Sequence, residues 1–355
     1  MALKWAGRQT VFLQKPPVIA SSAAVAGPKE GRGPLGAEYD LVLEDLRDGQ
    51  KCWERAETRM LSRAVQICLD KVGLKPNDIQ FFIAGDLLNQ ITCANAVARD
   101  LSIPFVGIYG ACSTLAEGMA IGSMLIDGGF AERVMVATSS HHNTAERQYR
   151  YPTEFGAQRT PASQWTVTGA GAFLLAAKGT GPRVTHATVG SVVDMGMKDV
   201  NDMGSAMAPA AASTIRAHFT DTGRTPADYD VVLTGDLASV GKALCDELLK
   251  QQGLDLSGRY EDCGLMVLRK DQDVHAGASG CACSALVLSG RVLKLLEAGK
   301  YRRVLMVATG ALHSPLTYQQ GESIPCIAHG IAIERVGDAS ARDLDAGVKE
   351  EALQP

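Results

Sequence analysis

The stretch that decides the fold is ACSTLAEGMAIGSMLIDGGFAERVMVAT, residues 111–138, which recurs as ACSALVLSGRVLKLLEAGKYRRVLMVAT, residues 282–309. Both copies begin with Ala-Cys-Ser and end with Met-Val-Ala-Thr, without a net gap between the two motifs. Self-similarity of this length is the sequence signature of a duplicated architecture. The chain is therefore predicted to contain two copies of one folding unit.

A second repeat lies upstream of the first and has a smaller offset. Gly85-Asp86-Leu87 returns as Gly235-Asp236-Leu237, so the second copy carries extra residues before its Ala-Cys-Ser motif. The polar segment 251–270 has no counterpart in the first copy. We therefore expect an insertion at about residues 238–275.

Each copy has the same order of expected elements: helix, apolar strand, small-residue helix, short strand, cysteine elbow, long helix and strand. The apolar strands are continuous, as in buried parallel sheets, and their alternation with helices predicts an α/β fold. The expected helices are 55–71, 89–101, 114–128, 205–219, 238–252 and 285–299. The expected strands are 79–84, 105–108, 133–138, 169–176, 231–234, 303–309 and 328–334.

The domain organisation follows from this order. Residues 51–180 are the expected first half and residues 181–340 the expected second half, with a polar tail at 341–355. Residues 1–50 include a Pro-, Gly- and Ser-rich run with few periodic apolar positions. We expect them to form an ordered arm on the surface of the first half.

Composition excludes several classes of protein. The 355 residues are 46% hydrophobic and 21% charged, which is typical of a soluble globular chain and not of a disordered or collagenous one. With 35 Lys and Arg against 39 Asp and Glu there is no basic field for nucleic acid. No apolar run has the length of a signal peptide or a membrane span, so neither is expected.

The nine cysteines are odd in number and scattered, which indicates reduced thiols and not a disulfide framework. The close pair Cys281-Ala-Cys283 lacks the second Cys or His pair of a zinc site, so no metal is expected. No phosphate-binding loop or dinucleotide fingerprint is present either. The sequence therefore predicts no cofactor.

A strand that ends at a small-residue cysteine elbow and opens a long helix resembles the thiolase superfamily, which includes the β-ketoacyl synthases. In that superfamily the cysteine of the first elbow is the nucleophile. Longer strings are similar to the stage V sporulation protein AD family of endospore-forming bacteria, from residue 7 to about 336. They include Gly85-Asp-Leu-Leu-Asn-Gln, Tyr109-Gly-Ala-Cys-Ser-Thr, Tyr151-Pro-Thr-Glu, Gln164-Trp-Thr-Val-Thr-Gly-Ala-Gly, Ser279-Gly-Cys-Ala-Cys-Ser and Glu322-Ser-Ile-Pro-Cys-Ile-Ala-His-Gly.

This resemblance implies a thiolase-like duplicated fold with a layered αβαβα core. It implies a non-catalytic protein of sporulation and germination that binds dipicolinic acid, pyridine-2,6-dicarboxylate, either free or as the calcium chelate. Its partners would be other proteins of the stage V sporulation A operon, with which it would move the ligand into the developing spore. It would sit peripherally at the spore inner membrane, as a homodimer paired through the strand at 105–108.

Cys112 stands at a helix start, where free N–H groups and the helix dipole favour anions and lower the pKa of a thiol. The resemblance implies that the two elbows meet at the centre. One elbow could then hold each carboxylate of a twofold-symmetric ligand, or the matching turns could serve packing alone. The predicted ligand-binding residues are Cys112, Ser113, Ser139, Ser140, His142, Cys283, Ser284, His313 and His329.

The main alternative is an active thiolase or ketoacyl synthase that uses Cys112 as its nucleophile. Such an enzyme needs an acid/base partner near the thiol, and His275, His313 and His329 are the candidates. A third possibility is a scaffold that holds membrane proteins together without using its pocket. Acylation of Cys112 would favour the enzyme, and partner binding without ligand would favour the scaffold.

Overall fold

A computed structural model of the chain describes residues 4–149 and 159–335. Its strands are β1 (Thr10–Phe12), β2 (Val18–Ala26), β3 (Leu41–Val42), β4 (Phe81–Gly85), β5 (Phe105–Gly107), β6 (Arg133–Ser140), β7 (Gln164–Thr166), β8 (Gly169–Ala176), β9 (Arg183–Thr188), β10 (Val231–Thr234), β11 (Tyr260–Asp262), β12 (Gly277–Ser279), β13 (Arg303–Ala311) and β14 (Cys326–Glu334). Its α-helices are α1 (Pro28–Gly31), α2 (Trp53–Asp70), α3 (Thr92–Leu101), α4 (Thr114–Asp127), α5 (His142–Tyr149), α6 (Met203–Thr222), α7 (Ala238–Gln251), α8 (Cys281–Val287), α9 (Leu293–Glu297) and α10 (Pro315–Gln319).

The duplication is visible in the strand order of the large sheet, β11-β10-β13-β14-β9-β2-β8-β6-β4-β5. Read outward from the centre, β2-β8-β6-β4-β5 and β9-β14-β13-β10-β11 have equivalent positions and equivalent parallel or antiparallel pairings. The two halves join where β2 and β9 meet, through the pair Val18 and Arg183. The predicted duplicated α/β fold is confirmed.

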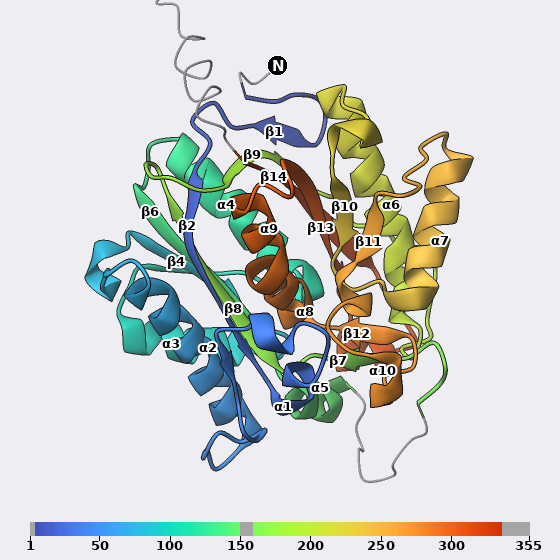
Figure 1. Cartoon of the computed structure of the whole chain (residues 1–355). Helices are drawn as coiled ribbons and strands as arrows, with labels where there is room; N and C mark the ends of the chain where they lie inside the picture. The colour runs from blue at the N-terminus through green and yellow to red at the C-terminus, as the bar shows by residue number, and fades with distance from the viewer. Residues whose placement is uncertain (1–3, 150–158, 336–355) are drawn as a thin grey trace, which may run out of the picture.

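Helices fill the space between the halves and cover their outer faces (Figure 1). Helix α4 contacts β6 of its own half and β13 and β14 of the other, while α8 contacts β8 and β6. Helices α2 and α3 pack on the outside of the first half, and α6 and α7 on the outside of the second. Three large apolar cores, one central and two outer, result from this layering, and a small fourth cluster of described residues lies at the first elbow.

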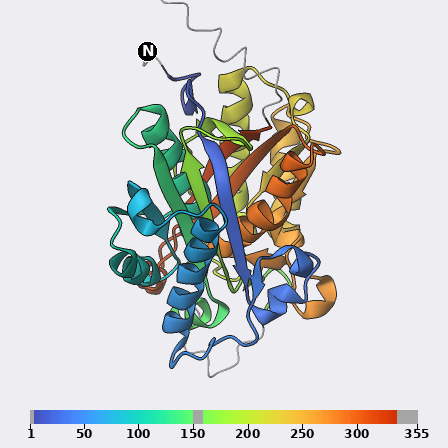
Figure 2. The same ribbon diagram turned by 60° about the vertical axis from the view of Figure 1, so that its left-hand side comes forward.

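Most expected elements lie within a few residues of their predicted bounds. The helix expected at 285–299 is interrupted, because a π-helical turn at 288–292 separates α8 from α9. The expectation of a surface arm at residues 1–50 is wrong for Val18–Ala26, which form β2 in the middle of the sheet (Figure 2). Small residues such as Ser21 and Ala24 hide this strand from a sequence search, because they are not typical of buried strands.

The extra residues of the second half lie mainly between β11 and α8. They form two 3₁₀ turns, Cys263–Leu265 and Lys270–Gln272, and then β12, which pairs in parallel with β7. The insertion therefore adds a second, two-stranded sheet beside the two elbows. The predicted domain boundaries remain a prediction, and the polar tail 341–355 and the string Tyr151-Pro-Thr-Glu lie outside the described residues. Among the described helices, none combines the length and apolar character that crossing a bilayer requires.

Candidate functional site

A cavity of about 90 Å³ lies beside the first elbow and opens to solvent. The first elbow, α5, β7, β12 and the end of β13 supply its walls, together with the start of α6. Its lining residues are Leu87, Ala111, Cys112, Ala145, Glu146, Tyr149, Gln164, Thr166, Val200, Asn201, Met203, Met207, Ser279, Ala311 and His313.

The first elbow places Cys112 at the wall of this cavity. Ala111 has a φ of 48°, in the left-handed region that non-glycine residues rarely occupy. The turn is held by the hydroxyl of Ser113, which donates to the Gly110 carbonyl at 2.6 Å, and by that of Thr114, which donates to the Ala111 carbonyl at 2.6 Å. Two side chains thus stabilise a strained turn that presents the thiol.

Behind the thiol lies a hydrogen-bonded network centred on Asp236. Sγ of Cys112 is 3.9 Å from Oγ of Ser279, and that hydroxyl donates to Oδ2 of Asp236 at 2.9 Å. The same carboxyl accepts from the Gly280 N–H at 3.0 Å and from the Thr309 hydroxyl at 2.5 Å. The network connects the first elbow to β12, to α8 and to β13.

The expected lowering of the Cys112 pKa is wrong. Burial raises the pKa of this thiol well above its usual value, and the nearby Asp236 carboxyl raises it further. The loss of water, and then the carboxyl beside the sulfur, outweigh the amides of the helix end. The thiol is therefore protonated at neutral pH, which is unfavourable for a nucleophile.

His313 is the predicted histidine that lines the cavity together with Cys112. It is 6% exposed, and its Nε2 is buried without a hydrogen-bond partner among the described residues. Burial lowers its pKa, so the ring is neutral. Its ring centroid lies 5.5 Å from that of Tyr149 and 5.9 Å from that of Tyr318. This edge of the cavity is therefore aromatic and offers one free ring nitrogen.

The other predicted histidines do not line the cavity. His275 faces solvent, with Nε2 3.3 Å from a carboxylate oxygen of Asp273. His329 lies on β14, where Nδ1 accepts the Gly190 N–H at 3.2 Å and burial lowers its pKa to about 4. Neither is placed to act as a base on Cys112, so their predicted catalytic roles lack geometric support. His142 stacks on Trp165, with ring centroids 3.6 Å apart.

The predicted serines serve the framework instead of the cavity. Ser139 donates to Glu57 at 3.0 Å, and Ser113 donates within its own turn. Ser140 donates to the Val167 carbonyl at 2.7 Å and accepts the Ala282 N–H at 3.2 Å. These side chains are not among the lining residues.

The second elbow does not line the cavity, which favours the alternative that the matching turns serve packing. Three N–H groups at this elbow are already bonded: Gly280 donates to Asp236, Ala282 to Ser140 and Cys283 to the Gly280 carbonyl. Cys283 and Ser284 are buried in α8, outside the cavity lining. The paired elbows therefore do not form a symmetric ligand site.

Several lining residues were not predicted from the sequence, chiefly Ser279, Gln164, Tyr149 and Asn201. Asp236 was not predicted either, although the repeated Gly-Asp-Leu motif contained the signal. A carboxyl directly after an apolar strand lies at the sheet edge where sites form in α/β folds. Ser279 could not be found in this way, because only the pairing of the insertion with β7 brings it to the thiol.

The chain is similar to known proteins over nearly all of its length. The sequence profile described as stage V sporulation protein AD (SpoVAD) matches residues 7–334. A protein named stage V sporulation protein AD from Bacillus subtilis (strain 168) is 50% identical over 338 residues, which cover 95% of this chain and 100% of that protein.

Solved structures share the fold at low sequence identity. Cerulenin-bound OleA of Xanthomonas campestris has a TM-score of 0.59 at 15% identity, covering 91% of this chain and 100% of that one. FabH, a 3-oxoacyl-(acyl carrier protein) synthase III from Pseudomonas aeruginosa PAO1, has a TM-score of 0.55 at 13% identity, covering 91% and 99%. The synthase III from Aquifex aeolicus VF5 has a TM-score of 0.53 at 13% identity, covering 90% and 99%. The predicted thiolase-like fold is therefore confirmed.

Proposed function

This chain belongs to the stage V sporulation protein AD family, and on that premise we propose that its cavity binds pyridine-2,6-dicarboxylate without chemical change. Membership makes it a sporulation protein with a thiolase-like fold. The ligand is the one that the family resemblance implies. The observation that carries the proposal is the buried, unpaired Nε2 of His313 beside the Tyr149 ring in the cavity.

The chemistry of the cavity wall suits a flat aromatic acid. Rings of Tyr149 and His313 offer faces and edges for stacking, and buried polar atoms without a partner favour a ligand that supplies one. Asn201 and Ser279 add an amide and a hydroxyl to the lining. A pyridine ring with two carboxylates can meet both the aromatic and the polar parts of this wall.

Charge in the cavity bears on the form of the ligand. Among the described lining residues Glu146 is charged, and no Lys or Arg accompanies it. The carboxylates would therefore be held by neutral donors, or would enter with calcium already offsetting their charge. Our proposal accordingly includes both the free acid and its calcium chelate.

The proposal is tested by isothermal titration of the protein with pyridine-2,6-dicarboxylate, with and without calcium. Ala311→Phe places a ring in the cavity from the end of β13, where the native side chain is half-buried and lines the pocket. We expect saturable binding by the native chain and at least a tenfold loss in the variant, provided circular dichroism shows it folded. Equal affinity in both proteins would exclude the cavity as the site.

We propose that Cys112 does not carry acyl groups, in contrast to a thiolase. The reason is the raised pKa of a thiol that lies beside Asp236 and, in the described part of the chain, has the Ser279 hydroxyl and no histidine as its hydrogen-bond partner. Incubation with acetyl-CoA followed by intact-protein mass measurement should leave the native mass unchanged. A stoichiometric acetyl adduct that Cys112→Ala abolishes would instead establish the enzyme.

The remaining proposals concern partners. Strand β5 is the outermost strand of its half and pairs with β4 on its inner side. An outer strand is a template for pairing with a second copy, which is the homodimer that the superfamily resemblance implies. Peripheral attachment at the spore inner membrane, through the other proteins of the stage V sporulation A operon, completes the proposed role. Its test is copurification of those proteins with the tagged chain from sporulating cells.

A further inference from the structure

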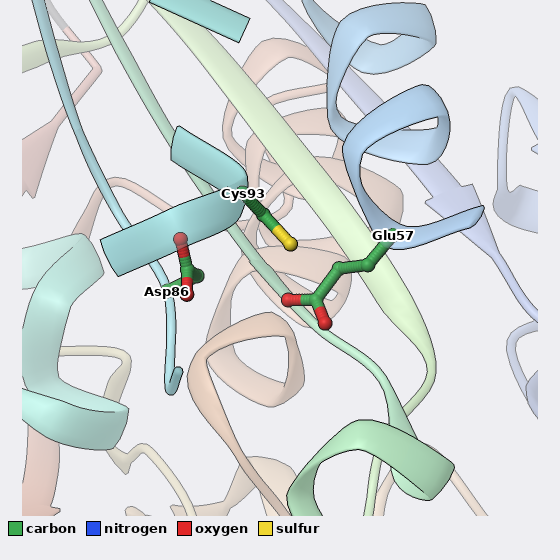
Figure 3. Close-up of side chains that lie close together, drawn as sticks. All are labelled: Glu57, Asp86 and Cys93. Carbon is green, nitrogen blue, oxygen red and sulfur yellow. The ribbon is translucent and has the colours of Figure 1, made fainter. Parts of the chain in front are cut away.

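Two carboxyl groups are buried together behind the wall of the cavity, outside its lining. Glu57 comes from α2 and Asp86 from the end of β4, and both are fully buried. The sulfur of Cys93, on α3, lies beside them: one carboxyl oxygen of Glu57, one of Asp86 and this sulfur all lie within 4.8 Å of one another (Figure 3). In the described part of the chain, neither carboxyl forms an ion pair with Lys or Arg.

The hydrogen bonds of Glu57 connect α2 to two elements near the cavity. Oε1 accepts from the Ser139 hydroxyl at 3.0 Å and Oε2 from the Thr144 hydroxyl at 2.8 Å. Thr144 lies on α5, directly before the lining residues Ala145 and Glu146. The position of this wall therefore depends on the Glu57 carboxyl.

Asp86 is bonded in the same way to the part of the cavity wall that contains Leu87. Its oxygens accept the N–H groups of Leu88 and Ala94, each at 2.8 Å. The residue between Asp86 and Leu88 is Leu87, a lining residue whose carbonyl accepts from the Tyr149 hydroxyl at 2.6 Å. Repulsion between the Glu57 and Asp86 carboxyls would therefore be transmitted to α5 through Thr144 and to Leu87, which line different parts of the cavity.

We propose that Glu57 is a positioning residue of the cavity, and that one proton shared between Glu57 and Asp86 holds α5 in the ligand-binding position. This inference rests on the proposed function for its ligand. Two ionised carboxylates at this separation, away from water, would repel each other strongly, because burial reduces the screening of their charges. Loss of the proton would therefore move Thr144 and Leu87 apart.

Other titratable groups around the pair do not neutralise it. Cys93 and Cys281 are buried thiols whose pKa values burial raises. Glu54 of α2 pairs with Arg147 at the surface, and Nε2 of His141 bonds to the Leu46 carbonyl. The phenols of Tyr109 and Tyr149 bond to each other at 3.0 Å. Each of these groups either is neutral or has another partner.

The pKa values of the pair have the direction that a shared proton requires. Burial, and then the Asp86 charge, raise the pKa of Glu57 to about 8, and burial raises that of Asp86 to about 6. Because unfolded carboxyls titrate near pH 4, the folded state holds these protons more tightly. The pair's contribution to stability is therefore full below about pH 4 and is lost as the pH rises through about 8.

The decisive experiment compares dipicolinate affinity at pH 7 and pH 9 in the native chain, Glu57→Gln and Glu30→Gln. A glutamine side chain is neutral at every pH, so Glu57→Gln imitates the protonated form of Glu57 at both pH 7 and pH 9. We expect affinity to fall about tenfold in the native chain between these pH values and to change less than twofold in Glu57→Gln. Glu30 is the matched control, because it is fully buried with a pKa raised by burial to about 7, yet it bonds to Thr168 and does not line the cavity.

A second readout does not need the ligand. Infrared difference spectra between pH 7 and pH 9 should show a protonated-carboxyl band that becomes weaker in Glu57→Gln. The carboxyl of Glu30, whose pKa burial raises to about 7, also contributes to this band, so Glu30→Gln should remove a different component and leave that of Glu57. If dipicolinate does not bind at any pH, the proposed function fails, but this readout still tests whether the pair holds a proton. An unchanged tenfold fall in Glu57→Gln, a band that Glu57→Gln leaves unchanged, or a stoichiometric metal ion lost with Glu57→Gln would overturn the shared proton.

Discussion

Replacing Asp236 with alanine is expected to lower the free energy of unfolding by about 3 kcal/mol, a large effect for one residue. The side chain is 1% exposed and accepts hydrogen bonds from Ser279, Gly280 and Thr309. Its loss leaves two buried donors, the Gly280 N–H and the Thr309 hydroxyl, and the half-buried Ser279 hydroxyl without this partner, and each buried donor costs the free energy of its lost hydration. Urea denaturation with linear extrapolation measures the change.

Two further variants make this expectation specific. Asp236→Asn keeps the shape but points an amide at some of the same donors, so we expect a smaller loss than with alanine. Asp246→Ala removes an exposed carboxylate that pairs with Lys250 four residues later, and should cost at most about 0.5 kcal/mol. A loss below about 1 kcal/mol in Asp236→Ala would mean that the network does not hold the elbows together.

His313→Phe is expected to weaken dipicolinate binding by about tenfold to a hundredfold. The phenyl ring keeps the contacts with Tyr149 and Tyr318 but removes Nε2, the atom for which residues 4–149 and 159–335 supply no hydrogen-bond partner. A hydrogen bond to a charged group contributes about 1.5–3 kcal/mol, which corresponds to this range of affinity. Isothermal titration at pH 7 gives the comparison.

The control is His329→Phe, because His329 has the same 6% exposure as His313 but lies outside the cavity. Its replacement should leave affinity within twofold of the native value, even if stability falls through the lost bond to Gly190. Similar losses in both variants would point to a general effect on folding. Native affinity in His313→Phe would remove this residue from the site.

The fold could be predicted because the duplication fixes the order of elements twice. The long helix and its following strand are apolar and regular, so α4, β6 and β13 were expected close to their observed bounds. The strand β2 was not expected, since Ser and Ala at its centre carry little strand signal and the neighbouring prolines favour a loop. Its place is set by pairing with β8 along its whole length, which only the folded chain contains.

A site residue could be predicted from the sequence only where a reactive or polar side chain stands at the end of a predicted helix or strand. Cys112 and His313 were predicted because their side chains are reactive and because one stands at the start of a helix and the other follows a strand. Both line the cavity. Ser140 and Ser284 have equally suggestive places, but the side of the backbone they face depends on packing between the halves. The direction of the shift in the thiol's pKa was also not predicted, because it depends first on burial in the folded chain and then on the Asp236 carboxyl, which comes from a distant part of the sequence.

The insertion that forms β12 has a consequence for how many ligands one chain can hold. A perfectly repeated chain would present two equal elbows and could take two ligands, or one ligand in two equivalent orientations. Here β12 brings Ser279 to the first elbow, while Asp236 and Ser140 bond the N–H groups of the second. The duplication supplied the symmetry, and a short segment of added sequence removed it at the centre, so we expect titration with the proposed ligand to give one site per chain.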